Sequence, residues 1–236
     1  MQGNLFQTKD NLSRIGKPVD KTKWEMSPQT VNAYYHPMNN EIAFPAGILQ
    51  PPFFDPEADD AINYGAMGGV IGHEITHGFD DQGRQYDADG NVKDWWTAED
   101  NSKFLERAKV IIDQFNSYMP VDSVNINGQL TQGENIGDLG GLTVALNAFK
   151  KTDQYKNQEL IDGFTPEQRF FLSWAQAFRS NIRNEHLKMM IKVDPHSPSM
   201  YRVIGPLSNM PEFIKAFNIK DNSPMARPEN LRVRIW

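Results

Sequence analysis

The stretch GGVIGHEITHGFDDQG, residues 68–83, constrains the fold more than any other part of this sequence. Apolar residues recur at helical spacing from about Glu57 to Phe79, which predicts a buried helix. The predicted helix also carries Gly65, Gly68, Gly69 and Gly72. Glycines lower helix propensity, so this helix makes sense only if neighbouring elements approach it closely. His73 and His77 are four residues apart and therefore project from one face of the helix.

Two imidazoles on one helix face can bind a single zinc ion. Glu74, next to the first histidine, points away from the metal but lies close enough to take a proton from metal-bound water. The pattern H-E-x-x-H on a helix is typical of hydrolytic zinc sites. It has only three fixed positions and also occurs by chance. The prediction therefore depends on finding a further ligand elsewhere.

A carboxylate is the natural third ligand, because the chain has no cysteine and only five histidines. In ENIGD, Glu134 and Asp138 are also four residues apart and share a helix face. Glu134 can complete a His, His, Glu site, and Asp138 can accept a hydrogen bond from the far nitrogen of a ligating histidine. Taken alone, such a pair is more often a solvated acidic face.

The remaining patterns predict a predominantly helical α+β fold with a small sheet. No linker divides the 236 residues, so a single domain over residues 1–236 is expected. The polar N-terminal segment to about Lys23 is predicted to form an extended strap or a short helix. The YDADGN segment is predicted to be a turn and not a calcium-binding loop. DPHSPSMYRVIGPLSN reads as loop with a short extended piece. The predicted strands are Val31–Tyr35 and Glu41–Phe44, and the other predicted helices run from Thr97 to about Tyr118, from Glu134 to Lys151, from Thr165 onward and over MPEFIKAFNI.

Composition excludes several classes of partner and site. The net charge is −6 and Lys and Arg do not cluster, which argues against nucleic acid as a partner. No run of 18 apolar residues exists, so no membrane span is expected, and the N-terminus lacks a signal-peptide pattern. Without cysteine there is no disulfide and no thiolate metal site.

Seven motifs in order resemble the catalytic C-terminal lobe of the neprilysin family of zinc endopeptidases, over roughly residues 18–236. The motifs are VNAYY, NEIAFPAGILQPPFF, VIGHEITHGFDDQG, ENIGDLGG, FFLSWAQAF, HSPSMYRVIGPLSN and the terminal RIW. The resemblance implies a thermolysin-like zincin fold and one zinc ion per chain, bound by His73, His77 and Glu134, with Glu74 as the general base.

The resemblance also assigns further roles. Asp138 and Asp80 would orient the ligating histidines, His196 would stabilise the transition state, and Arg202 would grip a substrate carbonyl. Asn32 and Ala33 would hold an extended peptide. The apolar pocket for the residue after the cleaved bond would consist of Ile48, Phe53, Val70, Ala177 and Phe178.

This sequence departs from the animal members of the family at several positions. Gly69 replaces a methionine and Ala177-Phe178 replaces a bulkier pair, which suggests a roomier pocket. Arg179 and Val233 stand where animal members have cysteines. The missing disulfides favour a bacterial-type member, either cytoplasmic or exported, and the sequence leaves the compartment open.

The expected function is a zinc metalloendopeptidase that hydrolyses oligopeptides on the amino side of hydrophobic residues. Family members are much longer, with an N-terminal helical lobe over the site that is absent from this chain. The alternative is therefore a fragment that binds zinc and peptides with little turnover. Apolar surface that would contact the absent lobe is expected to favour self-association.

Overall fold

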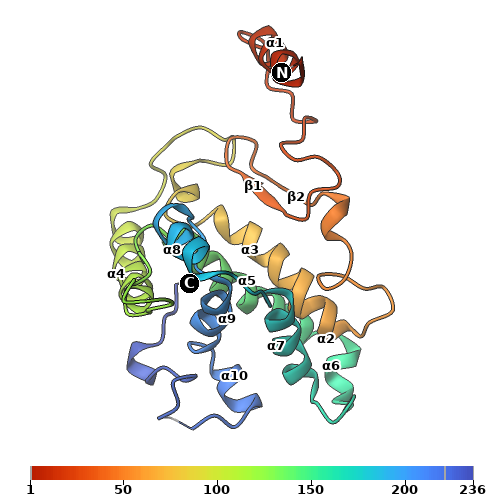
Figure 1. Ribbon diagram of the computed structural model, residues 1–236, viewed down its shortest axis with the longest axis vertical. Helices are drawn as coiled ribbons and strands as arrows, with labels where there is room; N and C mark the ends of the chain where they lie inside the picture. Colours follow the sequence, from red (N-terminus) through yellow and green to blue (C-terminus); the bar gives the residue numbers. More distant parts are fainter. Residues whose placement is uncertain (1, 221, 236) are drawn as a thin grey trace.

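The two helices that carry the predicted metal ligands lie side by side at the centre of the molecule (Figure 1). The computed structural model describes residues 2–220 and 222–235, so Trp236 of the terminal motif lies outside the described residues. The helices and strands are α1 (Gln2–Ser13), β1 (Tyr34–His36), β2 (Glu41–Ala43), α2 (Asp60–Asn63), α3 (Gly69–His77), α4 (Ala98–Asn116), α5 (Gln132–Phe149), α6 (Asp153–Asn157), α7 (Pro166–Ala177), α8 (Asn184–Val193), α9 (Ser199–Leu207) and α10 (Pro211–Ala216).

Glycines allow α3 and α5 to touch along their backbones. A Cβ atom added at Gly72 would lie 2.6 Å from the carbonyl oxygen of Gly141, and one added at Gly141 would lie 2.5 Å from the amide nitrogen of His73. These distances are too short for a side chain, so only glycine fits at both positions. The predicted close approach to the glycine-bearing helix is confirmed.

The predicted helix from Glu57 to Phe79 forms in three pieces. It begins at α2, where the Asp59 side chain accepts a hydrogen bond from the amide of Ala61. A π-helical turn over Tyr64–Gly68 follows and leads into α3. Such turns often occur next to functional sites, and this one directly precedes the helix with both histidines.

Two of the long helices begin where their capping residues predict. The Thr97 side chain accepts a hydrogen bond from the amide of Asp100 at the start of α4. Thr165 and Gln168 form a reciprocal capping box at the start of α7, with Pro166 in the first turn. Aromatic side chains of α5 and α7 then fill the core, with Phe149 and Phe170 stacked at 6.0 Å between ring centroids.

The interpretation of DPHSPSMYRVIGPLSN as loop was wrong in its second half, which forms α9. The amides of Tyr201 and Arg202 donate to the carbonyl oxygen of Pro198 and start the helix. Pro206 has no amide hydrogen to donate to the Arg202 carbonyl one turn earlier. The indole nitrogen of Trp174 donates to that oxygen instead, at 3.0 Å. A tertiary contact thus replaces the hydrogen bond that proline removes.

The small sheet is the antiparallel hairpin of β1 and β2, in which Tyr35 pairs with Ile42. The hairpin lies beside α3 (Figure 1). Strand β1 begins later than predicted, so Asn32 and Ala33 precede it in irregular backbone. The YDADGN segment is a turn, as predicted, because the Asp87 carboxylate accepts the amides of Asp89 and Asn91. Helices α6 and α8 were not predicted.

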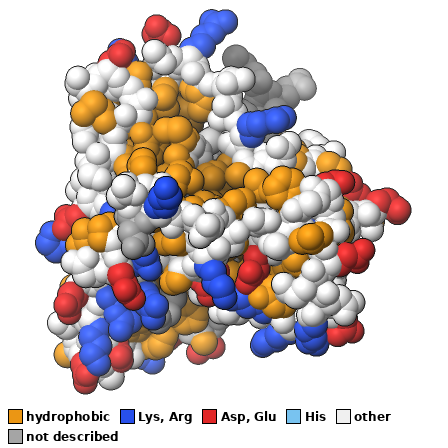
Figure 2. Space-filling view, turned by 90° about the horizontal axis from the view of Figure 1, so that it is seen from below, with side chains coloured by type: hydrophobic (Ala, Val, Ile, Leu, Met, Phe, Trp, Pro, Cys, Tyr) orange, Lys and Arg blue, Asp and Glu red, His pale blue; other side chains and the backbone are white. Residues whose placement is uncertain are grey.

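The polar opening forms a helix, α1, which lies apart from the rest of the molecule (Figure 1). On the face seen from below, hydrophobic side chains form a continuous band with charged side chains around it (Figure 2). The outer side of α3 also exposes Ile71 and Ile75. Within the described residues, no helix combines the length and apolarity needed to cross a bilayer.

Candidate metal centre and cleft

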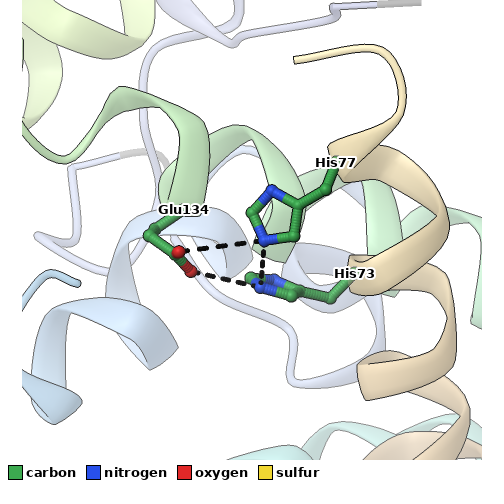
Figure 3. Close-up of side chains that lie close together, drawn as sticks. All are labelled: His73, His77 and Glu134. Atoms are coloured by element: carbon green, nitrogen blue, oxygen red, sulfur yellow. Dashed lines mark hydrogen bonds and ion pairs between the residues drawn. The ribbon is translucent and has the colours of Figure 1, made fainter. Parts of the chain in front are cut away.

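Three side chains from α3 and α5 converge on one point (Figure 3). The Nε2 atoms of His73 and His77 lie 2.9 Å apart. Glu134 Oε2 lies 3.2 Å from His73 Nε2, and Glu134 Oε1 lies 3.8 Å from His77 Nε2. One ligand atom from each residue lies within 4.8 Å of the other two. The structure therefore brings together the three residues that the sequence predicts as ligands.

The spacing of these atoms fits a tetrahedral zinc ion. With bond lengths of about 2.0–2.1 Å, ligand atoms around such an ion lie roughly 3.3 Å apart. The observed separations of 2.9–3.8 Å fall around that value. Glu134 Oε2 is also buried without a well-aligned hydrogen bond, which is costly for a carboxylate oxygen unless a cation neutralises it. Two imidazoles and one carboxylate are a usual donor set for zinc.

Each candidate histidine ligand has a carboxylate behind it. Asp138 Oδ1 lies 2.9 Å from His73 Nδ1, and Asp80 Oδ2 lies 2.6 Å from His77 Nδ1. These contacts direct the Nε2 atoms toward Glu134 and fix the ring orientations. The structure thus brings both predicted orienting aspartates into place, one on the ligand helix α5 and one just after α3.

The charged side chains of the candidate site shift one another's pKa values. Burial alone would lower the pKa of His73, but its contacts with Asp138 and Glu134 outweigh burial and raise that pKa to about 9. Burial would raise the pKa of Glu134, but the close approach of His73 holds it well below the usual carboxyl range. The ligand carboxylate is therefore ionised at neutral pH, as metal binding requires.

Arg202 is bound more tightly within the protein than the sequence suggests. Its Nε donates to Asp138 Oδ2 at 2.9 Å and its Nη2 donates to Asp138 Oδ1 at 2.6 Å. Its guanidinium also lies over the ring of Phe178, 4.6 Å from the centroid. Burial would raise the pKa of Asp138, but the arginine lowers it. Arg202 still lines the cleft, where it can meet a peptide.

Glu74 lies in the same cleft as the three ligands and is 5% exposed. Burial raises the pKa of its carboxyl group, while the two neighbouring histidines oppose the change. A carboxylate with a raised pKa is a better proton acceptor near neutral pH than an ordinary one. The geometry and the pKa both suit the predicted general base.

His196 lies opposite α5, with its Nε2 atom 3.2 Å from Glu134 Oε2. The sequence interpretation missed its partner, Asp194, whose Oδ1 lies 2.8 Å from His196 Nδ1 and accepts the backbone amide of the same residue. Residues 194–196 lie in irregular backbone, so neither helical nor strand periodicity could relate the aspartate to the histidine. The short D-P-H spacing was the only available signal.

The cleft has a volume of about 680 Å³ and takes in most of the predicted substrate contacts. Asn32 and Ala33 line it together with His196 and Arg202. Its apolar wall contains Ile48, Phe53, Val70, Trp174 and Phe178.

Two expectations about the apolar pocket need revision. Ala177 is not among the residues that line the cleft. A Cβ atom at Gly69 would lie 2.8 Å from the ring of Trp174, so that indole fills the space beside the glycine. Gly69 therefore accommodates Trp174 and does not by itself widen the pocket.

Comparisons with known proteins agree with this geometry. The model of peptidase family M13 matches residues 32–233. Neprilysin-3 of Drosophila melanogaster is 44% identical over 100% of this chain and 30% of its own length. An endothelin-converting enzyme homolog of Locusta migratoria is 47% identical over 94% of this chain and 31% of its own length.

Solved structures show the same relationship. Zinc metalloprotease Zmp1 of Mycobacterium tuberculosis, in complex with an inhibitor, matches with a TM-score of 0.93 and 47% identity over 98% of this chain and 36% of that one. PepO from Lactobacillus rhamnosis matches with a TM-score of 0.86 and 37% identity over 94% of this chain and 34% of that one. The chain spans about a third of the length of these relatives. Because sequence and fold agree over almost the whole chain, it belongs to peptidase family M13, the neprilysin family.

Proposed function

We propose that this chain carries the catalytic site of a zinc-dependent endopeptidase. The observation that carries the proposal is the convergence of His73, His77 and Glu134 in a cleft that also holds Glu74. In this proposal the three converging residues bind one zinc ion. Bound zinc would supply a Lewis acid that polarises the peptide carbonyl and makes water more acidic.

The protein side chains supply the proton transfers and the orientation. Glu74 takes a proton from the attacking water and delivers it to the leaving amine. His196 Nε2 faces the same space and donates to the negative charge that develops on the substrate carbonyl oxygen. Asn32 and Arg202 hold the peptide backbone on either side.

The preferred substrates are oligopeptides with a hydrophobic residue directly after the cleaved bond. The apolar cleft wall supports this preference, since Val70 lies one turn before the zinc ligand His73 on α3 and Ile48 and Phe53 lie near it. An apolar side chain that enters this region loses contact with water, which favours binding by about 25 cal/mol per Å² buried.

A second candidate function is zinc and peptide binding with little turnover. The His196 side chain is 43% exposed, so water competes with it for the developing charge. In that case zinc and peptide would bind normally, but the barrier to hydrolysis would stay high.

The test measures zinc content and hydrolysis separately. Metal analysis of the dialysed protein should give about one zinc per chain, and Glu134→Ala should lose it. A fluorogenic peptide with an apolar residue after the intended bond should be cleaved there, as mass spectrometry of the products would show.

Glu74→Gln should keep zinc and lose hydrolysis by at least about 100-fold, because the amide cannot accept the proton. The control is Glu99→Gln on α4, where the exposed carboxylate pairs with exposed Lys103 and does not line the cleft. Zinc retained by Glu134→Ala would remove that ligand from the proposal. Peptide binding without any cleavage by the zinc-loaded wild type would establish the second candidate instead.

A further inference from the structure

His196 is the one proposed catalytic side chain that stands on irregular backbone. It lies in the connection between α8 and α9, whereas Glu74 and Glu134 lie on helices. Asp194 orients the His196 ring, but Asp194 belongs to the same connection. That contact sets the ring relative to its own loop. It does not fix the loop relative to α5.

A buried hydrogen bond does fix the loop relative to α5, and it joins the residue after His196 to the residue after Glu134. Ser197 Oγ donates to Asn135 Oδ1 at 2.7 Å, and these side chains belong to residues that are only 3% and 1% exposed. Asn135 Nδ2 in turn donates to Thr131 Oγ1 at 2.9 Å, inside the first turn of α5. The asparagine is therefore held at both ends and cannot rotate to follow the loop.

The two partners lie directly next to the chemistry. Asn135 follows the proposed ligand Glu134, and Ser197 follows His196. The hydrogen bond thus joins residue pairs that are 62 positions apart in sequence, and it accompanies the 3.2 Å approach of His196 Nε2 to Glu134 Oε2. A hydrogen bond this deeply buried is costly to break, because each partner would then lack a substitute from water.

We infer that the Ser197–Asn135 hydrogen bond is a positioning device that holds His196 at the correct distance from the zinc ligand Glu134. The expected effect on hydrolysis rests on the proposed function, whereas the expected effect on the position of the His196 ring does not. Neither residue touches the substrate in this account. Both act through His196, so their loss lowers the rate of the chemical step and leaves substrate binding nearly intact.

The first experiment compares Ser197→Ala with Ser208→Ala in the zinc-loaded chain. Ser208 is a matched control, since it is 1% exposed and its hydroxyl donates to the carbonyl oxygen of Gly205 at 2.9 Å, away from the cleft. We expect Ser197→Ala to lower kcat by about tenfold or more, as small displacements of catalytic groups do. KM should stay within about twofold and zinc content should not change. Ser208→Ala should leave all three values unchanged.

The second experiment observes the His196 ring directly. The chain has only five histidines, so their imidazole signals can be resolved by NMR and His196 assigned with a His196→Gln variant. Ser197→Ala should broaden or shift the His196 ring signals, and Ser208→Ala should not. Asn135→Ala should have the same effect as Ser197→Ala. The double variant should have about the same kcat as the more impaired of the two single variants, because both changes remove the same contact.

Wild-type kcat and wild-type His196 signals in Ser197→Ala would overturn the inference. Equal kcat losses in Ser197→Ala and Ser208→Ala would also overturn it, because the serine would then act only through general stability. A displaced His196 ring with unchanged hydrolysis would support the positioning role and would instead contradict the catalytic role proposed for His196. Loss of both kcat and ring order confined to the Ser197 and Asn135 variants would support both.

Discussion

At the scale of single residues, the candidate zinc site depends on carboxylates that do not themselves reach the metal position. Asp80 contacts His77 at 2.6 Å and also accepts the backbone amides of Gln82 and Gly83. Asp138 contacts His73 and Arg202. These aspartates link the ligands to the surrounding backbone, so changing them should alter metal affinity without removing a ligand.

Asp80→Asn should weaken zinc binding by about 10–100-fold, because the neutral amide no longer supports the far nitrogen of His77. Competition with a chromophoric zinc chelator measures the affinity. Asp87→Asn is the matched control, since Asp87 also accepts two backbone amides but in an exposed turn that does not line the cleft. Equal affinities for the two variants would show that Asp80 only shapes the loop.

Arg202→Met should destabilise the fold by about 3–5 kcal/mol, because it leaves the fully buried Asp138 carboxylate without its bidentate arginine partner. Arg14→Met provides the comparison, since the half-buried pair of Arg14 with Asp10 near the surface should contribute only about 0–1 kcal/mol. Urea unfolding at neutral pH measures both. Similar small losses would mean that Asp138 finds another partner.

The same pair should show a defined pH dependence. The folded pKa of Asp138 is lowered because Arg202 outweighs the effect of burial. Its contribution to stability is therefore present above the ordinary unfolded carboxyl pKa of about 4, and it is lost as pH falls through the lower folded value. The difference between wild type and Arg202→Met should shrink in acid and stay constant between pH 6 and 8.

At the scale of elements, local sequence signals predict where helices start. They do not predict long-range contacts that replace a missing helical hydrogen bond. Thr97 and Thr165 mark their helices because a capping side chain acts within one turn. Helix α9 was not predicted, and it contains Pro206, a residue that removes a helical hydrogen bond. Its freed carbonyl is satisfied by Trp174, which is 32 positions away from the proline in sequence. No local pattern reveals such a donor.

Gly72→Ala should destabilise the pairing of α3 and α5 by about 1–3 kcal/mol, because the new methyl group would lie 2.6 Å from the carbonyl oxygen of Gly141. Gly68→Ala is the control, since its nearest neighbour would be at an ordinary 3.5 Å. That variant should be neutral or slightly more stable. Thermal unfolding separates the two, and an unchanged melting temperature for Gly72→Ala would mean that the helices can move apart freely.

At the scale of the whole molecule, the chain has one centre, the packed pair α3 and α5, and most of the candidate site is attached to it. The spacing of the histidines and carboxylates predicted this centre because both patterns lie on single helices. The position of His196 relative to Glu134 was not predictable from spacing. It depends on a connection between α8 and α9, and α8 itself had not been recognised.

Removing zinc should weaken this centre without unfolding the molecule. The proposed ligands come from both α3 and α5, so bound zinc cross-links the two helices, and ligand binding at 100 times Kd adds about 2.7 kcal/mol of stability. The packing of α3 against α5 has contacts of its own, since glycines let the two backbones touch and Glu134 Oε2 lies 3.2 Å from His73 Nε2. A chelator should therefore lower the melting temperature by several degrees and leave the far-ultraviolet circular dichroism nearly unchanged.

Zinc should restore the melting temperature and magnesium should not, because magnesium prefers oxygen ligands. In Glu134→Ala, chelator and zinc should both have little effect. A chelated wild type that loses its helical signal would show that zinc, and not the packing of α3 against α5, holds the centre together.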